Sequence, residues 1–183
     1  MADRAFDDAS LEQLAPVRIQ ATPSYESFFR TEYRGLVALA YSLTGSRGTA
    51  EDLAQDALLV AYRRWEHVAQ LDLPAAWVRR TCVNLATSWR RRKSAELRAM
   101  LRLGPPRSDE PAPDPGASGG GDVFWASVRR LPSRQAQCIA LRYVYGCSVA
   151  EVAAVLRCSE GSVKQHLARA KARLQADLGE VPS

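Results

Sequence analysis

The chain has 183 residues, which is enough for one domain or two small ones, each with an economical core. Its hydrophobic fraction of 46% and charged fraction of 25% are those of an ordinary globular protein and exclude wholesale disorder. No apolar run approaches the roughly 20 residues that a membrane span needs. Residues 1–20 also lack the basic start and apolar middle of a signal peptide. We therefore expect a cytoplasmic protein with no membrane insertion.

The net charge of +5 is unevenly distributed along the chain. Residues 1–78 carry −4, residues 79–107 carry +8, residues 108–122 carry −4 and residues 123–183 carry +5. Two separate basic blocks are typical of a protein that meets a polyanion at more than one place.

No residue pattern in the chain predicts catalysis. The four cysteines, Cys82, Cys138, Cys147 and Cys158, form no C-x-x-C pair, and three of them lie in apolar surroundings. We expect them to be structural thiols rather than metal ligands. Since the sequence also contains no catalytic triad and no phosphate-binding loop, we expect neither an enzyme nor a bound cofactor.

Residues 104–121 divide the chain into two modules. This segment has five Gly and five Pro among eighteen residues, and such a composition buries too little apolar surface to offset its ordering entropy. It is typical of a linker that is stiff at its Pro-rich start and flexible at its Gly-rich end. We expect a first module at 24–103, a second at 122–183, and a loosely ordered tail at 1–23.

Helical periodicity dominates the first module, and no alternating strand pattern appears on either side of the linker. The first predicted helix begins at Ser24 and ends at Thr44-Gly45. Thr49 is predicted to cap the second helix, with Asp52 completing a variant capping box. A loop at 67–73 then leads to a third helix that starts at Pro74 and extends to Lys93 or on to Leu103.

The second module is predicted to contain a helix-turn-helix. A helix that starts at Ser133 stops at Gly146, and Ser148 with Glu151 forms a capping box for a short helix. Ser159 then caps a longer helix that ends near Leu178. This length pattern and the short turn match the DNA-binding motif.

The last predicted helix has one apolar stripe and an opposite polar face. The stripe consists of Val163, Leu167, Ala170 and Leu174. The residues on the opposite face and its flanks are Ser162, Lys164, Gln165, His166, Ala168, Arg169, Lys171 and Arg173. Gln and Arg are able to recognise base edges in the major groove, while flanking cations hold phosphates. A solvated, charged surface helix is the alternative.

The third predicted helix also has two faces. Its expected core residues are Val78, Cys82, Leu85 and Trp89, and its other face presents Trp77, Arg80, Thr81, Asn84, Ser88 and Arg91. Arginines mixed with an aromatic and an amide suit single-stranded DNA. An ordinary basic surface helix with a partly buried Trp explains the same residues.

The second predicted helix is acidic at its start. Glu51, Asp52, Gln55, Asp56 and Arg63 lie beside Leu59, Tyr62 and Trp65. Acids followed by a base complement the helix dipole, and they would equally suit a protein-docking face.

Three blocks resemble the bacterial sigma-70 family of transcription factors. AEDLAQDALLVAYRRW (50–65) is similar to region 2.2, and PAAWVRRTCVNLATSWRRRK (74–93) is similar to regions 2.3–2.4. LPSRQAQCIALRYVYGCSVAEVAAVLRCSEGSVKQHLARAKARL (131–174) is similar to regions 4.1–4.2. Region 1.1 is missing and the linker leaves no room for region 3. This layout resembles the extracytoplasmic-function (group 4) sigma factors, particularly those of actinobacteria.

The resemblance implies three binding surfaces. The residues that would dock on the clamp coiled coil of the RNA polymerase largest subunit are Asp52, Gln55, Asp56, Leu59 and Arg63. Asn84, with the segment 66–73, matches positions that receive a flipped base of the −10 element, and Trp77, Arg80, Ser88, Arg90 and Arg91 match positions near the melted strand. Lys164, Gln165, His166 and Arg169 match the −35-recognising positions. Lys and His replace arginines common in relatives there, so the −35 preference should differ in detail.

These expectations amount to an all-α protein of two small helical domains, sigma region 2 and sigma region 4, joined by the linker. Its implied function is to bind core RNA polymerase and direct initiation at promoter DNA, with an anti-sigma factor as a conceivable further partner. Two alternatives stay open. One is a stand-alone helix-turn-helix regulator with an N-terminal sensor or dimerisation domain, and the other is a polymerase-binding decoy or anti-sigma partner.

Overall fold

The computed structural model describes residues 24–103 and 120–178, and these residues form eight helices and no strand. The predicted all-α class is therefore confirmed for the described part of the chain. The predicted tail at 1–23 and residues 104–119 of the predicted linker lie outside it.

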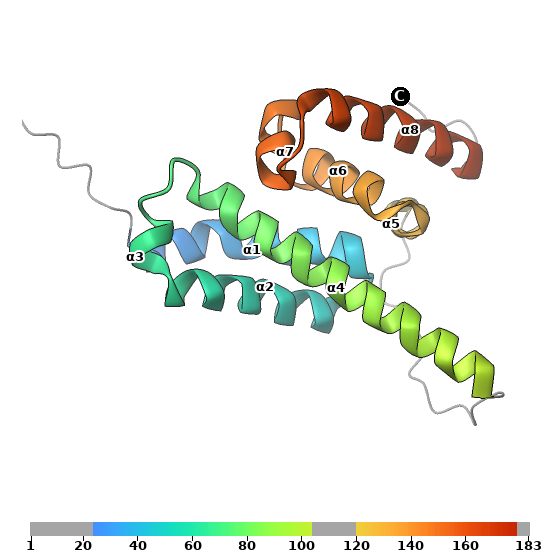
Figure 1. The fold of residues 1–183 in the computed structure, drawn as a ribbon, viewed down its shortest axis with the longest axis horizontal. Helices are drawn as coiled ribbons and strands as arrows, with labels where there is room; N and C mark the ends of the chain where they lie inside the picture. The colour runs from blue at the N-terminus through green and yellow to red at the C-terminus, as the bar shows by residue number, and fades with distance from the viewer. Residues whose placement is uncertain (1–23, 104–119, 179–183) are drawn as a thin grey trace, which may run out of the picture.

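The first module contains the helices α1 (Tyr25–Thr44), α2 (Arg47–Arg63), α3 (Trp65–Val68) and α4 (Pro74–Leu103). Helices α1 and α2 lie side by side, and the long α4 crosses them on one side and extends beyond them (Figure 1). Their apolar stripes meet in a core whose largest buried side chains include Leu36, Leu39, Leu58, Val78 and Val83. This core holds α4 against the α1–α2 pair.

Local capping signals explain most helix ends in the first module. Ser24 caps α1 by accepting a hydrogen bond from the Ser27 N–H, and Gly45 ends it with a left-handed φ of 76°, as predicted. The prediction that Thr49 caps α2 is wrong. Ser46 is the N-cap, and its side chain accepts a hydrogen bond from the Thr49 N–H at 3.4 Å. Helix α2 begins directly after the turn at Gly45 because Ser46, the next residue, supplies the capping oxygen.

The chain between α2 and α4 differs partly from the predicted loop at 67–73. Helix α3 ends at Val68, so it occupies the start of that segment, and Val68 is fully buried. Helix α4 starts at Pro74 as predicted and takes the longer of the two predicted extents.

The second module contains α5 (Gly120–Arg130), α6 (Ser133–Val144), α7 (Val149–Leu156) and α8 (Glu160–Leu178). The predicted ends of α6, α7 and α8 are confirmed: Gly146 has a φ of 66°, and the Ser148–Glu151 capping box is complete. The Ser159 hydroxyl accepts a hydrogen bond from the Ser162 N–H at 3.2 Å. Helix α5 was not among the predicted elements, and it begins inside the segment assigned to the linker.

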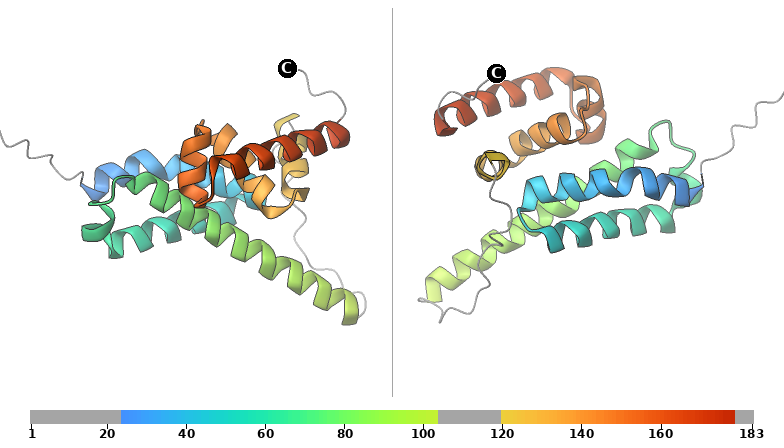
Figure 2. Two further views of the ribbon diagram at one scale, coloured as in Figure 1. Left: turned by 45° about the horizontal axis from the view of Figure 1, so that its top comes forward. Right: turned by 180° about the vertical axis from the view of Figure 1, so that it is seen from behind.

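The two modules pack against each other. Helix α1 contacts α5 and α6, and α4 contacts α7, so α5–α8 cover one edge of the first module (Figures 1 and 2). The buried apolar residues form one cluster that runs through both modules. Two sequence-separated modules thus share a continuous core across the described residues.

The four cysteines are free thiols. Cys82, Cys138 and Cys147 are buried and Cys158 is half-buried, consistent with their predicted structural role. Burial raises the pKa of Cys82 to about 12. Among the described helices, none combines the length and apolar character that crossing a lipid bilayer would require.

Candidate functional site

Helices α7 and α8 form the predicted helix-turn-helix. The turn between them places Arg157 in the left-handed region, with a φ of 49°. At the start of α7, the Ser148 N–H donates to Glu151 Oε2 at 2.7 Å, and the Glu151 N–H donates to Ser148 Oγ at 3.2 Å. These hydrogen bonds to Ser148 lower the pKa of Glu151. The motif is therefore fixed by local capping at both helix starts.

Helix α8 turns its polar face to solvent. Val163, Ala170 and Leu174 are buried against the rest of the second module, and Leu167 is half-buried. The exposed residues predicted to contact DNA are Lys164, Gln165, Arg169, Lys171 and Arg173. One exposed face thus presents an amide and four cations, as a recognition helix requires.

Two of the predicted −35 residues are less accessible. His166 is half-buried, and its Nδ1 atom is buried without a hydrogen-bond partner. The Ser162 hydroxyl lies 2.9 Å from the Ser159 hydroxyl at the start of α8. Arg173 lies on the flank, where its Nη1 atom donates to Gln135 Oε1 at 3.5 Å. The exposed centre of the face is therefore Gln165 and Arg169.

Helix α4 has a polar face of mixed accessibility. Its predicted core residues Val78 and Cys82 are buried, and Leu85 and Trp89 are half-buried against the core. Of the six predicted −10 residues on α4, Asn84 and Arg91 are exposed. The partly buried members are Trp77, Arg80, Ser88 and Arg90.

Two arginines of this set lie at the second module. Arg90 donates a hydrogen bond to the backbone oxygen of Arg129, and burial followed by the charge of Arg129 lowers the pKa of Arg90. Burial also lowers the pKa of Arg80, and the nearby charges of Arg157 and Arg134 lower it further. The structure therefore brings these partly buried side chains close to the second module.

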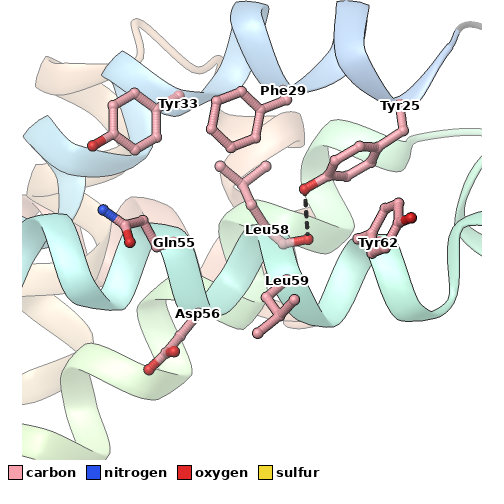
Figure 3. A pocket seen from close by; sticks show the side chains of 8 residues that line it. All are labelled: Tyr25, Phe29, Tyr33, Gln55, Asp56, Leu58, Leu59 and Tyr62. Atoms are coloured by element: carbon pink, nitrogen blue, oxygen red, sulfur yellow. Dashed lines mark hydrogen bonds between the residues drawn. The ribbon is translucent and has the colours of Figure 1, made fainter.

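A pocket of about 510 Å³ lies between α1 and α2 (Figure 3). Tyr25, Phe29 and Tyr33 line it from α1, and Gln55, Asp56, Leu58, Leu59 and Tyr62 line it from α2. The Tyr25 hydroxyl donates to the Leu58 carbonyl at 3.0 Å, and the rings of Tyr25 and Tyr62 lie 4.9 Å apart. Burial, and secondly Tyr62, raises the pKa of Tyr25. Its lining is mostly apolar and aromatic, and Asp56 is the carboxylate among the lining residues.

The structure brings together three of the five residues predicted to dock polymerase. Gln55, Asp56 and Leu59 line the pocket, whereas Asp52 and Arg63 are exposed on α2 outside its lining. The three aromatic residues of α1 were missed. Their spacing of i, i+4 and i+8 is the signal that was available, because it places them on one helix face.

The pocket lies on the α1–α2 pair, and no residue of α4 lines it. Helices α1 and α2 lie in front of α4 in Figure 3 and behind it in Figure 1. In the described part of the chain no three His, Cys, Asp or Glu side chains are grouped to hold a metal ion. The fold and these surfaces define a class: an all-helical DNA-binding protein with a helix-turn-helix module and a second helical module.

Comparison with known proteins identifies the family. The model of sigma-70 region 2 matches residues 28–96, and the model of sigma-70 region 4 matches residues 122–174. RNA polymerase sigma-E factor of Streptomyces coelicolor is 33% identical over 84% of this chain and 85% of its own. ECF RNA polymerase sigma factor SigM of Mycobacterium tuberculosis is 31% identical over 85% and 78%. The chain belongs to the sigma-70 family, in its extracytoplasmic-function group.

Solved structures agree with this assignment. The sigma factor RpoE of Bartonella quintana, in complex with the anti-sigma factor NepR, has a TM-score of 0.66 at 25% identity and covers 85% of this chain and 98% of its own. CnrH, in complex with the cytosolic domain of CnrY, shares the fold with a TM-score of 0.59 at 23% identity, over 84% and 86%. The chain is a sigma factor that directs transcription initiation, and its family consists of non-enzymatic initiation factors. The stand-alone regulator is not favoured, since its first module matches region 2.

Proposed function

We propose that the first module holds core polymerase on its α1–α2 side and promoter DNA on its α4 side. The observation that supports this proposal is that α1 and α2 alone line the pocket, whereas Asn84 and Arg91 are exposed on α4. A protein partner and a DNA strand could then bind the same module together. Asp52 and Asp56 would disfavour DNA near the pocket, while the basic residues of α4 would attract it.

Core polymerase would dock at the pocket between α1 and α2. Leu59 and Tyr62 are 44% and 60% exposed and line the same pocket, and exposed apolar side chains gathered in one place are what marks an interaction surface. Exposed aromatic and aliphatic residues around a concave surface are typical anchors of protein interfaces. Asp52, Asp56 and Arg63 would form the charged rim that orients the partner.

The −10 DNA would bind along α4. Asn84 offers an exposed amide able to hydrogen-bond an unpaired base, and Arg91 is free to hold the strand near it. Trp77 and Ser88 flank this position, and Arg80 and Arg90 extend the basic face. Extruding a base costs a few kcal/mol, which stacking and hydrogen bonding must offset.

The −35 duplex would bind α8, with Gln165 and Arg169 at base edges and Lys164, Lys171 and Arg173 at phosphates. His166 and Ser162 would act at the margins of this contact because they are half-buried. We also infer an anti-sigma factor as a further partner, since the similar sigma factor RpoE was solved in complex with the anti-sigma factor NepR.

Run-off transcription tests this proposal. The purified chain is added to core polymerase over a promoter library, and specific transcripts should appear only when both are present. The Arg169→Ala variant should lose selection at the −35 element and keep binding to core polymerase. Tight duplex binding by the chain alone, with no specific initiation on any promoter, would contradict the proposal.

A further inference from the structure

The contact between the two modules centres on three polar side chains, which we call the interdomain cluster: Glu32, Arg79 and Tyr145. Glu32 and Arg79 form a two-pronged ion pair within the first module, with distances of 2.8 Å and 3.0 Å. Tyr145 comes from the second module, donates its hydroxyl to Glu32 Oε2 at 3.3 Å, and lies under the Arg79 guanidinium at 4.1 Å. The side chains of Glu32 and Arg79 are only 6% and 19% exposed.

Burial and the neighbouring charges together set the pKa values in this cluster. Burial alone would lower the pKa of Arg79, but its hydrogen bond and charge interaction with Glu32 more than offset that effect and raise it. Burial and the neighbouring Glu32 raise the pKa of Tyr145, so its hydroxyl stays a donor. Tyr145 thus completes the hydrogen bonding of a buried ion pair of the first module, and removing it would leave Glu32 with one partner fewer.

Gly35 makes room for Tyr145. It lies inside α1, where glycine is less favourable than alanine by roughly 0.5–1 kcal/mol. A Cβ atom at this position would lie 2.7 Å from the Tyr145 ring. Tyr145 of the second module therefore packs directly on the backbone of α1 at Gly35, where any larger residue would collide with its ring.

The same contact covers part of the proposed −10 face. Gln137 of α6 donates to Thr87 Oγ1 at 2.9 Å, and Arg90 donates to the backbone of Arg129. The Nη1 atom of Arg80 is buried without a hydrogen-bond partner. Arg134 and Arg157 of the second module are the charges that act on it. In this arrangement the second module covers part of the surface of Arg80 and Arg90 that a DNA strand would contact.

We propose that this arrangement is a closed resting state in which the second module blocks the −10 face until the interdomain cluster opens. The part that concerns DNA rests on the proposed function of α4. One end of the contact, at Glu32, Arg79 and Tyr145, is attractive. The other end places Arg80 near the like charges of Arg134 and Arg157. Opening removes that repulsion and frees Arg80 for a phosphate. Both modules belong to one chain, so closing is an intramolecular step at high effective concentration.

The Gly35→Ala variant of the full chain tests the closed state. It should improve the helix propensity of α1 while pushing Tyr145 away, so the first module keeps its fold and the contact opens. Gly48→Ala is the matched control, because Gly48 also lies in a helix and its added Cβ would meet nothing within 4 Å. Small-angle X-ray scattering should show a larger radius of gyration for Gly35→Ala and an unchanged value for Gly48→Ala. Tyr145→Ala should reproduce the increase by removing the other partner.

DNA binding tests whether the closed state blocks α4. The probe is a single-stranded oligonucleotide of mixed sequence at low salt. If opening raises the competent fraction from about a tenth to about a half, apparent affinity should rise about fivefold for Gly35→Ala. Equal radii of gyration for the native chain and both opening variants would overturn the closed state. A larger radius without tighter DNA binding would overturn the blocking. Failure of the proposed function is distinguishable, because native and opened chains would then both lack promoter-specific transcription with core polymerase.

Discussion

Leu58 and Leu59 are neighbours on α2 with opposite surroundings, and they separate folding from docking. Leu58 is fully buried, whereas Leu59 is 44% exposed at the pocket. We expect Leu59→Ala to weaken binding to core polymerase and to leave the fold intact. We expect Leu58→Ala to destabilise the first module.

The exposed fraction sets the size of each effect. Full burial of a leucine side chain stabilises by about 1.5–3 kcal/mol, so burying the remaining 44% of Leu59 on docking would contribute about 0.7–1.3 kcal/mol. That energy corresponds to a Kd about 3- to 10-fold weaker for Leu59→Ala. For Leu58→Ala, the lost burial and the cavity together should lower the free energy of unfolding by about 2–5 kcal/mol.

Two measurements on the same proteins decide the matter. Thermal unfolding followed by circular dichroism should leave the Tm of Leu59→Ala close to that of the native chain and lower the Tm of Leu58→Ala. Titration of labelled core polymerase should give the weaker Kd for Leu59→Ala. A Kd within twofold of the native value, with the protein folded, would refute the assignment of the pocket as the docking surface.

The other predictions concern DNA and the thiols. Asn84→Ala should reduce open-complex yield, measured by permanganate footprinting, without changing core binding; an unchanged yield would remove Asn84 from the −10 site. Arg169→Ala should weaken −35 recognition by about 1–3 kcal/mol if it contacts a base, and an equal loss on scrambled −35 DNA in a filter-binding assay would make it a phosphate contact. At pH 8, mass spectrometry should find Cys158 alkylated by iodoacetamide before Cys82 and Cys138. Burial raises the pKa of those two thiols from 9.0 to about 12 and about 11. Because the pKa of these thiols is raised in the folded state, their contribution to stability is complete below about pH 9 and is lost as the pH rises towards 11–12. Chemical denaturation should therefore give a lower free energy of unfolding at pH 10 than at pH 8.

Sequence alone predicted the elements whose causes are local. The bounds of α1 and α7 follow from Ser24, Gly45 and the Ser148–Glu151 box, because capping depends on residues three or four positions apart. The one capping error chose between two hydroxyl residues near each other, Ser46 and Thr49, either of which has the required chemistry. In the structure the backbone places Ser46 at the N-cap, and Thr49 is the residue that donates its N–H to it.

The surfaces could be predicted only where one helix face defines them. The exposed face of α8 followed from its 3.6-residue period, and Gln165 and Arg169 lie on it as predicted. The interdomain cluster was beyond such reasoning. Glu32 and Arg79 are separated by 47 residues and Glu32 and Tyr145 by 113, and no local pattern encodes that meeting. No sequence pattern explains Gly35 either, because the reason for a glycine there is the Tyr145 ring, which lies far away along the chain.

The positions of the pocket and the interdomain cluster imply an order of events. No residue of the second module lines the pocket, and Leu59 and Tyr62 are exposed while the modules are packed together. If core polymerase docks at the pocket as proposed, it reaches this surface on the closed chain. Opening is then a step on the polymerase surface instead of a condition for reaching it. On this order, Gly35→Ala should leave the Kd for core polymerase unchanged and increase the rate of promoter complex formation. Stopped-flow measurements of both steps would separate this order from one in which opening comes first, because the latter requires tighter core binding by the opened variant.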